Sequence, residues 1–168
     1  MGNASFSNND SLQRALIVFF RLAMGWTFLY AGVTQVFIEP HWTAASFLAG
    51  TKTFHFLYGP LVGSSLMPLI DFCVKWGHLL IGLSLVSGLM VRVSGVFGIL
   101  LMLVYWTAHL NFPYVSSPVN FLLDEHIVYA VLIVYLIAVR AGHVCGLDGF
   151  VEKLPTIEQN PILRPLVR

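Results

Sequence analysis

The sequence predicts an all-α fold: an integral membrane four-helix bundle with an interfacial helix or lid between its first and second helices. Of the 168 residues, 57% are hydrophobic, only 10% are charged, and the mean hydropathy is +0.79. A soluble domain carries roughly a quarter charged residues, and disordered chains are far less hydrophobic. The composition therefore excludes a soluble monomer and a disordered tail protein, and it favours a lipid bilayer as the solvent.

Four apolar runs supply the helices, because roughly 20 apolar residues cross a bilayer and backbone in lipid must satisfy its own hydrogen bonds. The predicted helices lie at about 14–38, 66–91, 93–110 and 118–141. Ser117 and Pro118 are expected to start the fourth helix, as a capping hydroxyl followed by proline at the first helical position. We expect residues 1–150 to form a single membrane domain and residues 151–168 to form an extended cytoplasmic tail.

The long first connection is rich in aromatic side chains, including Trp42, Phe47, Phe54, Phe56 and Tyr58. Such residues suit a short helix that lies at headgroup depth in the membrane interface. They suit equally a lid that packs over the end of the bundle. The sequence leaves both interpretations open.

Basic residues set the expected orientation, because Lys and Arg near a membrane gather on its cytoplasmic side. The N-terminal end, the middle loop and the C-terminal tail hold seven of the nine: Arg14, Arg21, Arg92, Arg140, Lys153, Arg164 and Arg168. The opposite side holds Lys52 and Lys75. We expect a multi-pass protein of the plasma (inner) membrane with both termini cytoplasmic. Cys73 and Cys145 then lie near opposite faces and cannot pair within one chain.

This orientation places most of the polar groups of the helices in the outer half of the bundle. They are Glu39, His41, Asp71, Lys75, His78, Tyr105, Trp106, His109, Asp124, Glu125 and His126. Ionisable groups are costly inside a membrane and usually face the bundle interior. We therefore expect a site that opens toward the extracytoplasmic side.

Structural interpretations compete with that site. Asp71 and Lys75 are one turn apart and could form an interfacial ion pair. The run Asp124, Glu125 and His126 could simply cap the fourth helix, whose N-terminus favours carboxylates. His109 could be a satisfied interface histidine, whereas His78 lies some three turns inside the membrane and needs a partner.

Arg21 is expected to extend toward the inner interface, or less readily to contact an anionic lipid or another subunit.

The sequence also argues against a bound metal and against nucleic-acid binding. No local pair with metal-ligand spacing occurs, so no bound metal is expected. The net charge of +1 gives no nucleic-acid footprint.

Several segments resemble a known family. They are the opening-helix segment RLAMGWTFLYAGV (21–33), the second-helix segment GHLLIGLSLVSGLMVRVSG (77–95), the fourth-helix start SPVNFLLDEHIVYA (117–130) and the closing turn GLDG (146–149). Their order and spacing, over residues 15 to 150, resemble the DoxX/DoxD family of small four-helix membrane proteins. The chain departs from that pattern at Gln35, where the family usually has lysine, and at His78, where it often has glutamate.

The resemblance implies a redox role. The DoxD branch is similar to the membrane subunit of thiosulfate:quinone oxidoreductase, which works with a partner subunit and delivers electrons to quinone. A quinone as cofactor would need an apolar slot with hydrogen-bond donors and a route for protons, which a histidine suits. The expected catalytic residues are His78, His109, Asp71 and Glu125, and the expected quinone-binding residues are Tyr105, Trp106 and Tyr129.

Two other functions stay open. A non-catalytic accessory subunit of a larger membrane enzyme complex fits the polar, proline-rich tail LPTIEQNPILRPLVR, which suits lying on other membrane subunits. A small transporter is disfavoured, because the inner half offers almost no polar path besides Arg21 and no inverted repeat is evident. Whether the chain is itself an enzyme is not decided by its sequence.

Overall fold

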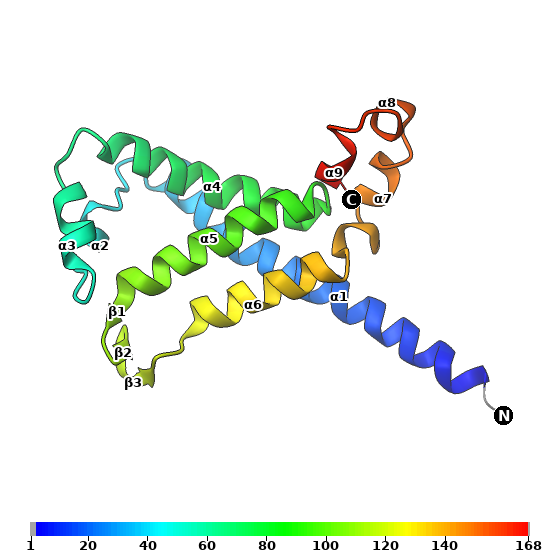
Figure 1. Cartoon of the computed structure of the whole chain (residues 1–168), viewed down its shortest axis with the longest axis horizontal. Helices are drawn as coiled ribbons and strands as arrows, with labels where there is room; N and C mark the ends of the chain where they lie inside the picture. The colour runs from blue at the N-terminus through cyan, green and yellow to red at the C-terminus, as the bar shows by residue number, and fades with distance from the viewer. Residues whose placement is uncertain (1–2, 168) are drawn as a thin grey trace.

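The structure, a computed structural model, describes residues 3–167, without the side chains of residues 3–9 and 117–119. The long helices are α1 (Asn3–Val33), α4 (Met67–Ser87), α5 (Val91–His109) and α6 (Glu125–Ala138). The short helices are α2 (Ala45–Ala49), α3 (His55–Tyr58), α7 (Asp148–Val151), α8 (Pro155–Glu158) and α9 (Arg164–Val167). Helices α4 and α5 form an antiparallel hairpin, and α6 returns antiparallel beside α5 (Figure 1).

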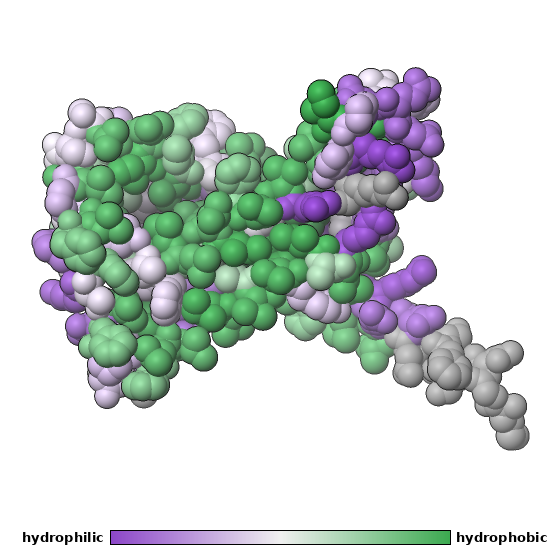
Figure 2. All heavy atoms as spheres, in the orientation of Figure 1, coloured by the Kyte–Doolittle hydropathy of each residue, from purple (hydrophilic) through white to green (hydrophobic). Residues whose placement is uncertain are grey.

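Three stretches are long and apolar enough to cross a membrane, namely Asp10–Ile38, Met67–Ser87 and Val91–His109. Helix α6 is apolar but has only 14 residues. Hydrophobic side chains cover the middle of the visible face, and hydrophilic ones gather at its two ends (Figure 2). This distribution is that of a helical membrane protein.

The two ends of the bundle differ. The first, here called the terminal end, carries the start of α1 and helices α7–α9 (Figure 1). The second, here called the polar end, carries α2, α3 and a small sheet (Figure 1). The sheet has the order β1 (Leu110–Asn111), β2 (Tyr114–Val115), β3 (Ser117–Phe121), with both pairs antiparallel.

Glycines let α1 and α4 approach closely. A Cβ atom on Gly32 would lie 2.4 Å from the Leu79 backbone nitrogen. A Cβ atom on Gly82 would lie 2.3 Å from the Leu29 backbone nitrogen. Since no real Cβ atom tolerates such distances, the spacing of these two helices depends on glycine.

Arg21 holds the terminal end together. Its side chain is 2% exposed and donates hydrogen bonds to the backbone oxygens of Ala141 (2.7 Å), Val144 (2.9 Å) and Cys145 (3.0 Å). Arg21 therefore ends on protein backbone at the terminal end and does not reach solvent or lipid headgroups. The turn after α6 presents backbone carbonyl groups to α1, and the guanidinium fork binds three of them.

Asp148 caps the start of α5. Its two carboxylate oxygens accept hydrogen bonds from the backbone N–H groups of Met90 (2.7 Å) and Val91 (3.2 Å). Burial raises the pKa of this carboxyl group, while those two hydrogen bonds, His143 and Arg21 oppose the rise.

The break between α4 and α5 lies earlier than predicted. Gly88 ends α4 in the left-handed conformation with φ of 70°. A glycine adopts this conformation without steric cost, so the helix ends here. The predicted break around Arg92 is therefore wrong, since Arg92 lies in the first turn of α5.

The fourth helix begins later than predicted. Ser117 and Pro118 belong to the edge strand β3, where a proline removes no hydrogen bond from the sheet interior. The cap is Asp124, whose carboxylate accepts a hydrogen bond from the His126 backbone N–H at 3.1 Å. The expectation that this acidic run caps the helix is confirmed for Asp124.

Residues 39–66, here called the connecting segment, pack on the polar ends of α4 and α5. Leu48 and Tyr58 are buried there together with Met67 and Ala108. The Tyr58 hydroxyl lies 2.6 Å from the Thr107 hydroxyl. Some aromatic residues of this segment therefore pack on the helices, while others, such as Phe56, are exposed at the surface.

The C-terminal tail is not extended within the described residues. Helices α8 and α9 each span four residues, and α9 packs against α5. Val167 is 4% exposed. The prediction of an extended tail is therefore wrong for residues 151–167, because burial of apolar side chains draws the chain back onto the bundle.

Candidate functional site

The polar end contains a small cavity between all four long helices. Its volume is about 160 Å³. The lining residues are Thr27, Phe28, Ala31, His78, Met102, Tyr105, His126 and Tyr129. We call it the four-helix cavity. Since Thr27 is exposed on α1, the cavity reaches the surface on the side of that helix.

Aromatic and imidazole rings stack beside this cavity, with Tyr105 at the centre. Its ring centroid lies 5.6 Å from that of His78 and 5.6 Å from that of His126, which is almost parallel to it. His109 stacks on His126 at 4.9 Å. Phe47 of α2 lies edge-on to His109 at 4.6 Å, so the connecting segment closes one end of the stack.

His78, His109 and His126 each form a hydrogen bond through the Nδ1 atom. The acceptor is the Val74 carbonyl for His78 (2.8 Å), the Tyr105 carbonyl for His109 (3.0 Å) and the Asp124 carboxylate for His126 (2.7 Å). These oxygens only accept, so we assign the Nδ1 proton to each ring. The Nε2 atom of each neutral ring is then left as a hydrogen-bond acceptor.

The end of α1 contributes a buried amide. The helix continues as a π-helical turn over Thr34–Ile38, which buries Gln35 at 8% exposure. The Gln35 side chain hydrogen-bonds Tyr105, while its Oε1 atom lacks a partner among the described residues. Unpaired buried oxygens are rare, so this end of the bundle retains an acceptor for a ligand or water.

The structure brings together part of the predicted site. His78, Tyr105 and Tyr129 line the cavity, and His109 lies in the adjoining ring stack. Asp71, Trp106 and Glu125 are not among the lining residues.

Asp71 and Trp106, which do not line the cavity, each form a hydrogen bond with a backbone group elsewhere. Asp71 accepts a hydrogen bond from the Ala44 backbone N–H at 2.8 Å and so anchors the start of α2. Trp106 donates its indole N–H to the Leu122 carbonyl at 2.9 Å, which ties α5 to the segment before α6. Glu125, by contrast, is exposed.

The predicted ion pair between Asp71 and Lys75 does not form. The Lys75 ammonium donates to the Pro40 carbonyl at 3.4 Å and lies 5.8 Å from the Trp42 ring centroid. Both charged side chains instead contact the connecting segment, where a backbone N–H and a carbonyl needed partners.

The sequence-based site omitted His126. The signal was available, because His126 precedes Tyr129 by three residues and such residues share a helix face. Glu125, four residues before Tyr129, is exposed and does not line the cavity. Phe28 and Met102 were not assigned to the site because apolar side chains in a membrane helix carry no distinguishing signal.

Asp124, Glu125 and His126 also raise the question of a metal. One potential ligand atom of each lies within 4.8 Å of the others. However, both Asp124 oxygens already accept hydrogen bonds from His126. We therefore interpret this run as a helix cap and not as a set of metal ligands.

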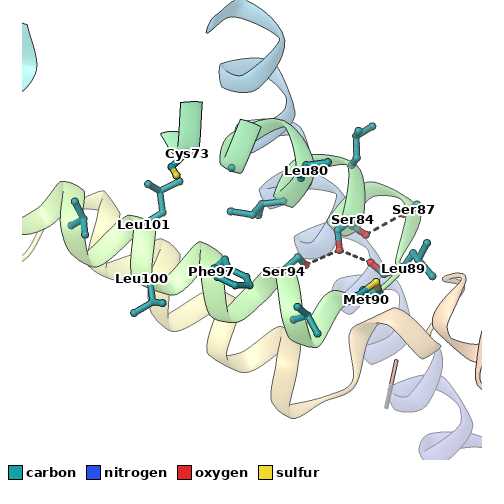
Figure 3. Close-up of a pocket in the computed structure, with 15 residues that line it drawn as sticks. Cys73, Leu80, Ser84, Ser87, Leu89, Met90, Ser94, Phe97, Leu100 and Leu101 are labelled. Carbon is teal, nitrogen blue, oxygen red and sulfur yellow. Dashed lines mark hydrogen bonds between the residues drawn. The ribbon is translucent and has the colours of Figure 1, made fainter. Parts of the chain in front are cut away.

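A larger hollow of about 750 Å³ lies between α4 and α5, but its wall is almost wholly apolar (Figure 3). Leu80, Phe97 and Leu100 line it (Figure 3). Its serines bond within the wall, since Ser84 donates to the Leu89 carbonyl and lies 2.6 Å from the Ser94 hydroxyl. This groove has the chemistry of a lipid-facing surface, so we place the candidate site in the smaller, polar cavity.

The fold and the cavity together define a small helical membrane protein with a histidine- and tyrosine-lined pocket at one end. A family model described as DoxX matches residues 16–110. The chain belongs to the DoxX family, as its motifs indicated. Searches of curated proteins and of solved structures found no match to this chain.

Proposed function

We propose that this chain is the membrane subunit of a quinone-linked redox system that oxidises a small sulfur compound such as thiosulfate, with electrons passing through a partner chain. The observation that carries this proposal is the four-helix cavity. It combines the polar atoms of His78, Tyr105, His126 and Tyr129 with apolar walls from Phe28 and Met102.

The chemistry of a quinone matches these walls. A quinone presents a flat apolar ring, which stacking rings recognise, and two carbonyl oxygens, which can accept hydrogen bonds from the Tyr105 and Tyr129 hydroxyls. The Nε2 atom of neutral His78 can accept a hydrogen bond from the hydroxyl group of the quinol product. The cavity of about 160 Å³ is smaller than the pockets of roughly 300–1,000 Å³ that hold whole drug-sized ligands. It therefore suits the head of a quinone, with the hydrocarbon tail leaving past Thr27 into the bilayer.

The proposed topology follows from charge and length. We take α6 as the fourth membrane span, with the capped residues before it and Arg140 after it at the two interfaces. Most basic residues lie toward the terminal end, so that end is cytoplasmic. The four-helix cavity then faces the extracytoplasmic half of the plasma membrane.

The connecting segment is proposed as a lid over the site. Its α2 helix is anchored by Asp71, and its Phe47 side chain covers the ring stack. Asp71 thus supports the site through the lid and not by proton exchange.

The test is thiosulfate-dependent reduction of a short-chain quinone by membranes that contain the chain together with its partner subunits. The variant His78→Ala is expected to lower the rate at least tenfold. Glu158→Gln, at an exposed position of the terminal end, is expected to leave the rate unchanged. An unchanged rate in the double variant His78→Ala/His109→Ala would overturn the proposal.

A second candidate function is a non-catalytic accessory subunit of a larger membrane complex. It is favoured by exposed apolar side chains at the terminal end, where Phe150 is 73% and Ile162 78% exposed. Purification in a mild detergent separates the two functions. Copurifying large subunits that carry haem or copper would favour the accessory role, whereas quinone reduction by the chain with one small partner would favour the redox role.

A further inference from the structure

We propose that Asp124 and His126 form a proton-transfer dyad that links the four-helix cavity to the aqueous phase at the polar end. The inference rests on the proposed quinone chemistry and names the group that supplies its protons. In this arrangement the protons consumed by quinone reduction are drawn from the side of the membrane on which the polar end lies.

The geometry of the pair is that of a held imidazole. The Asp124 side chain has 0% exposure, and its Oδ2 atom lies 2.7 Å from His126 Nδ1. Its Oδ1 atom accepts the His126 backbone N–H at 3.1 Å. Because one buried carboxylate binds both the ring and the backbone of the same residue, the ring orientation is fixed.

The His126 ring stands between the cavity and the surface. It lines the four-helix cavity, yet its side chain is 14% exposed. His78 is also in the cavity wall, but its Nδ1 atom is held by a backbone carbonyl inside α4. Among the lining residues, His126 is the histidine that a buried carboxylate supports.

Other titratable groups face His126 from the elements around it. From α5 these are Tyr105 and His109, both stacked on its ring. From α6 it is followed by Tyr129 and preceded by the exposed Glu125, and α4 contributes His78 across the cavity. The lining residues from α1, Thr27, Phe28 and Ala31, do not titrate.

The step balances as follows. The protonated His126 ring keeps its Nδ1–H bond to Asp124 and donates its Nε2–H to a quinone carbonyl oxygen. As the quinone receives electrons from the sulfur compound, the Nε2–H bond breaks, an O–H bond forms, and the ring becomes neutral. Water at the polar end then returns the proton to Nε2, and two such transfers with two electrons give the quinol. Asp124 stays ionised throughout and stabilises the protonated ring.

The experiment measures quinone reduction in the assembled complex as a function of pH. His126→Ala is expected to lower the rate roughly 10²-fold, the usual contribution of general acid catalysis. It is also expected to remove the acceleration of the wild-type rate toward acid pH, and added imidazole should restore part of the rate. Asp124→Asn keeps a good helix-capping residue while removing the charge, so the fold is retained and the rate falls without rescue by imidazole.

Glu158→Gln, at an exposed position of the terminal end, serves as the matched control and is expected to preserve both rate and pH profile. If the wild-type complex reduces quinone but His126→Ala and Asp124→Asn behave like it, the dyad is overturned and the proposed function stands. A rate loss in His126→Gln with an unchanged pH profile and no rescue of His126→Ala would mean a positioning role, which also overturns the dyad. If the wild-type complex reduces no quinone, the proposed function fails and the dyad fails with it.

Discussion

Gln35 and His78, the two positions at which the family resemblance is incomplete, both lie beside Tyr105. Gln35 hydrogen-bonds the Tyr105 side chain, and the His78 ring lies 5.6 Å from the Tyr105 ring. Both side chains therefore lie beside the same tyrosine.

We predict that Gln35→Lys or His78→Glu alone destabilises the protein, because each leaves a buried charge without a partner, a change that costs about 3 kcal/mol. The double variant is expected to recover at least half of the summed loss, as the two charges pair. Thermal unfolding in detergent micelles, followed by tryptophan fluorescence, measures this coupling. Strictly additive losses would show that the two positions do not interact.

The sequence predicts members of the candidate site only where a polar side chain in a membrane helix would cost free energy if it faced lipid. His78, Tyr105 and Tyr129 were identified because polar groups in membrane helices seek the interior. Asp71 and Trp106 have the same chemistry but satisfy backbone groups, and a sequence does not reveal which backbone group will need a partner. His126 and Glu125 both lie about one turn before Tyr129, and the sequence does not show which of them the helix directs into the cavity.

At the scale of elements, α4 presents two glycines in different surroundings. Gly82 packs against α1, whereas a Cβ atom on Gly77 would meet nothing within 4 Å. The sequence does not tell the two glycines apart, and only the fold shows which one faces α1.

We predict that Gly82→Ala destabilises the protein by about 2 kcal/mol, because the added methyl group must push α1 away. Gly77→Ala is the matched control in the same helix and should leave stability unchanged or slightly raised, since alanine favours helix. The measurement is again thermal unfolding in micelles. Equal effects of the two substitutions would contradict the observed packing of α1 on α4.

Arg21 also connects separate elements, because its side chain joins α1 to the turn after α6. Three segments of the family resemblance meet at this point: a Cβ atom on Gly88 would lie 2.8 Å from an Arg21 guanidinium nitrogen, and one on Gly146 would lie 2.5 Å from it. Motifs far apart in sequence thus form one structural unit, which sequence order alone could not indicate.

We predict that Arg21→Lys lowers stability by about 3 kcal/mol, since a single ammonium cannot reach the three carbonyl groups that the guanidinium fork binds. Arg14→Lys, on an exposed position of the same helix, should change stability by less than about 0.5 kcal/mol. The thermal unfolding midpoints of the two variants and the wild type in detergent measure these changes in stability. A tolerated Arg21→Lys would mean that the three hydrogen bonds contribute little.

At the scale of the whole molecule, composition was the most informative property of the sequence. It predicted a helical membrane protein, and the apolar middle with polar ends agrees with that class (Figure 2). The small sheet and the folded tail were not predicted, because short segments with Pro113, Pro118 and Pro155 take their conformation from tertiary contacts and not from periodicity.

The orientation predicted from basic residues has a direct test. In a background with Cys73→Ser and Cys145→Ser, single cysteines are introduced as Ser65→Cys at the polar end and Lys153→Cys at the terminal end, both exposed positions. A membrane-impermeant maleimide applied to intact cells is expected to label the first and not the second until the cells are opened. The reverse pattern would place the four-helix cavity on the cytoplasmic side.

The central claim is that a quinone head binds in the four-helix cavity, and photoaffinity labelling tests it most directly. A short-chain azidoquinone is bound to the purified chain in mild detergent, irradiated, and its attachment sites are mapped by mass spectrometry. We predict labelling near Thr27, Met102 and Tyr129 that unlabelled quinone competes away and that His78→Ala reduces at least tenfold. Labelling confined to the apolar groove between α4 and α5, or labelling that unlabelled quinone leaves unchanged, would contradict the claim.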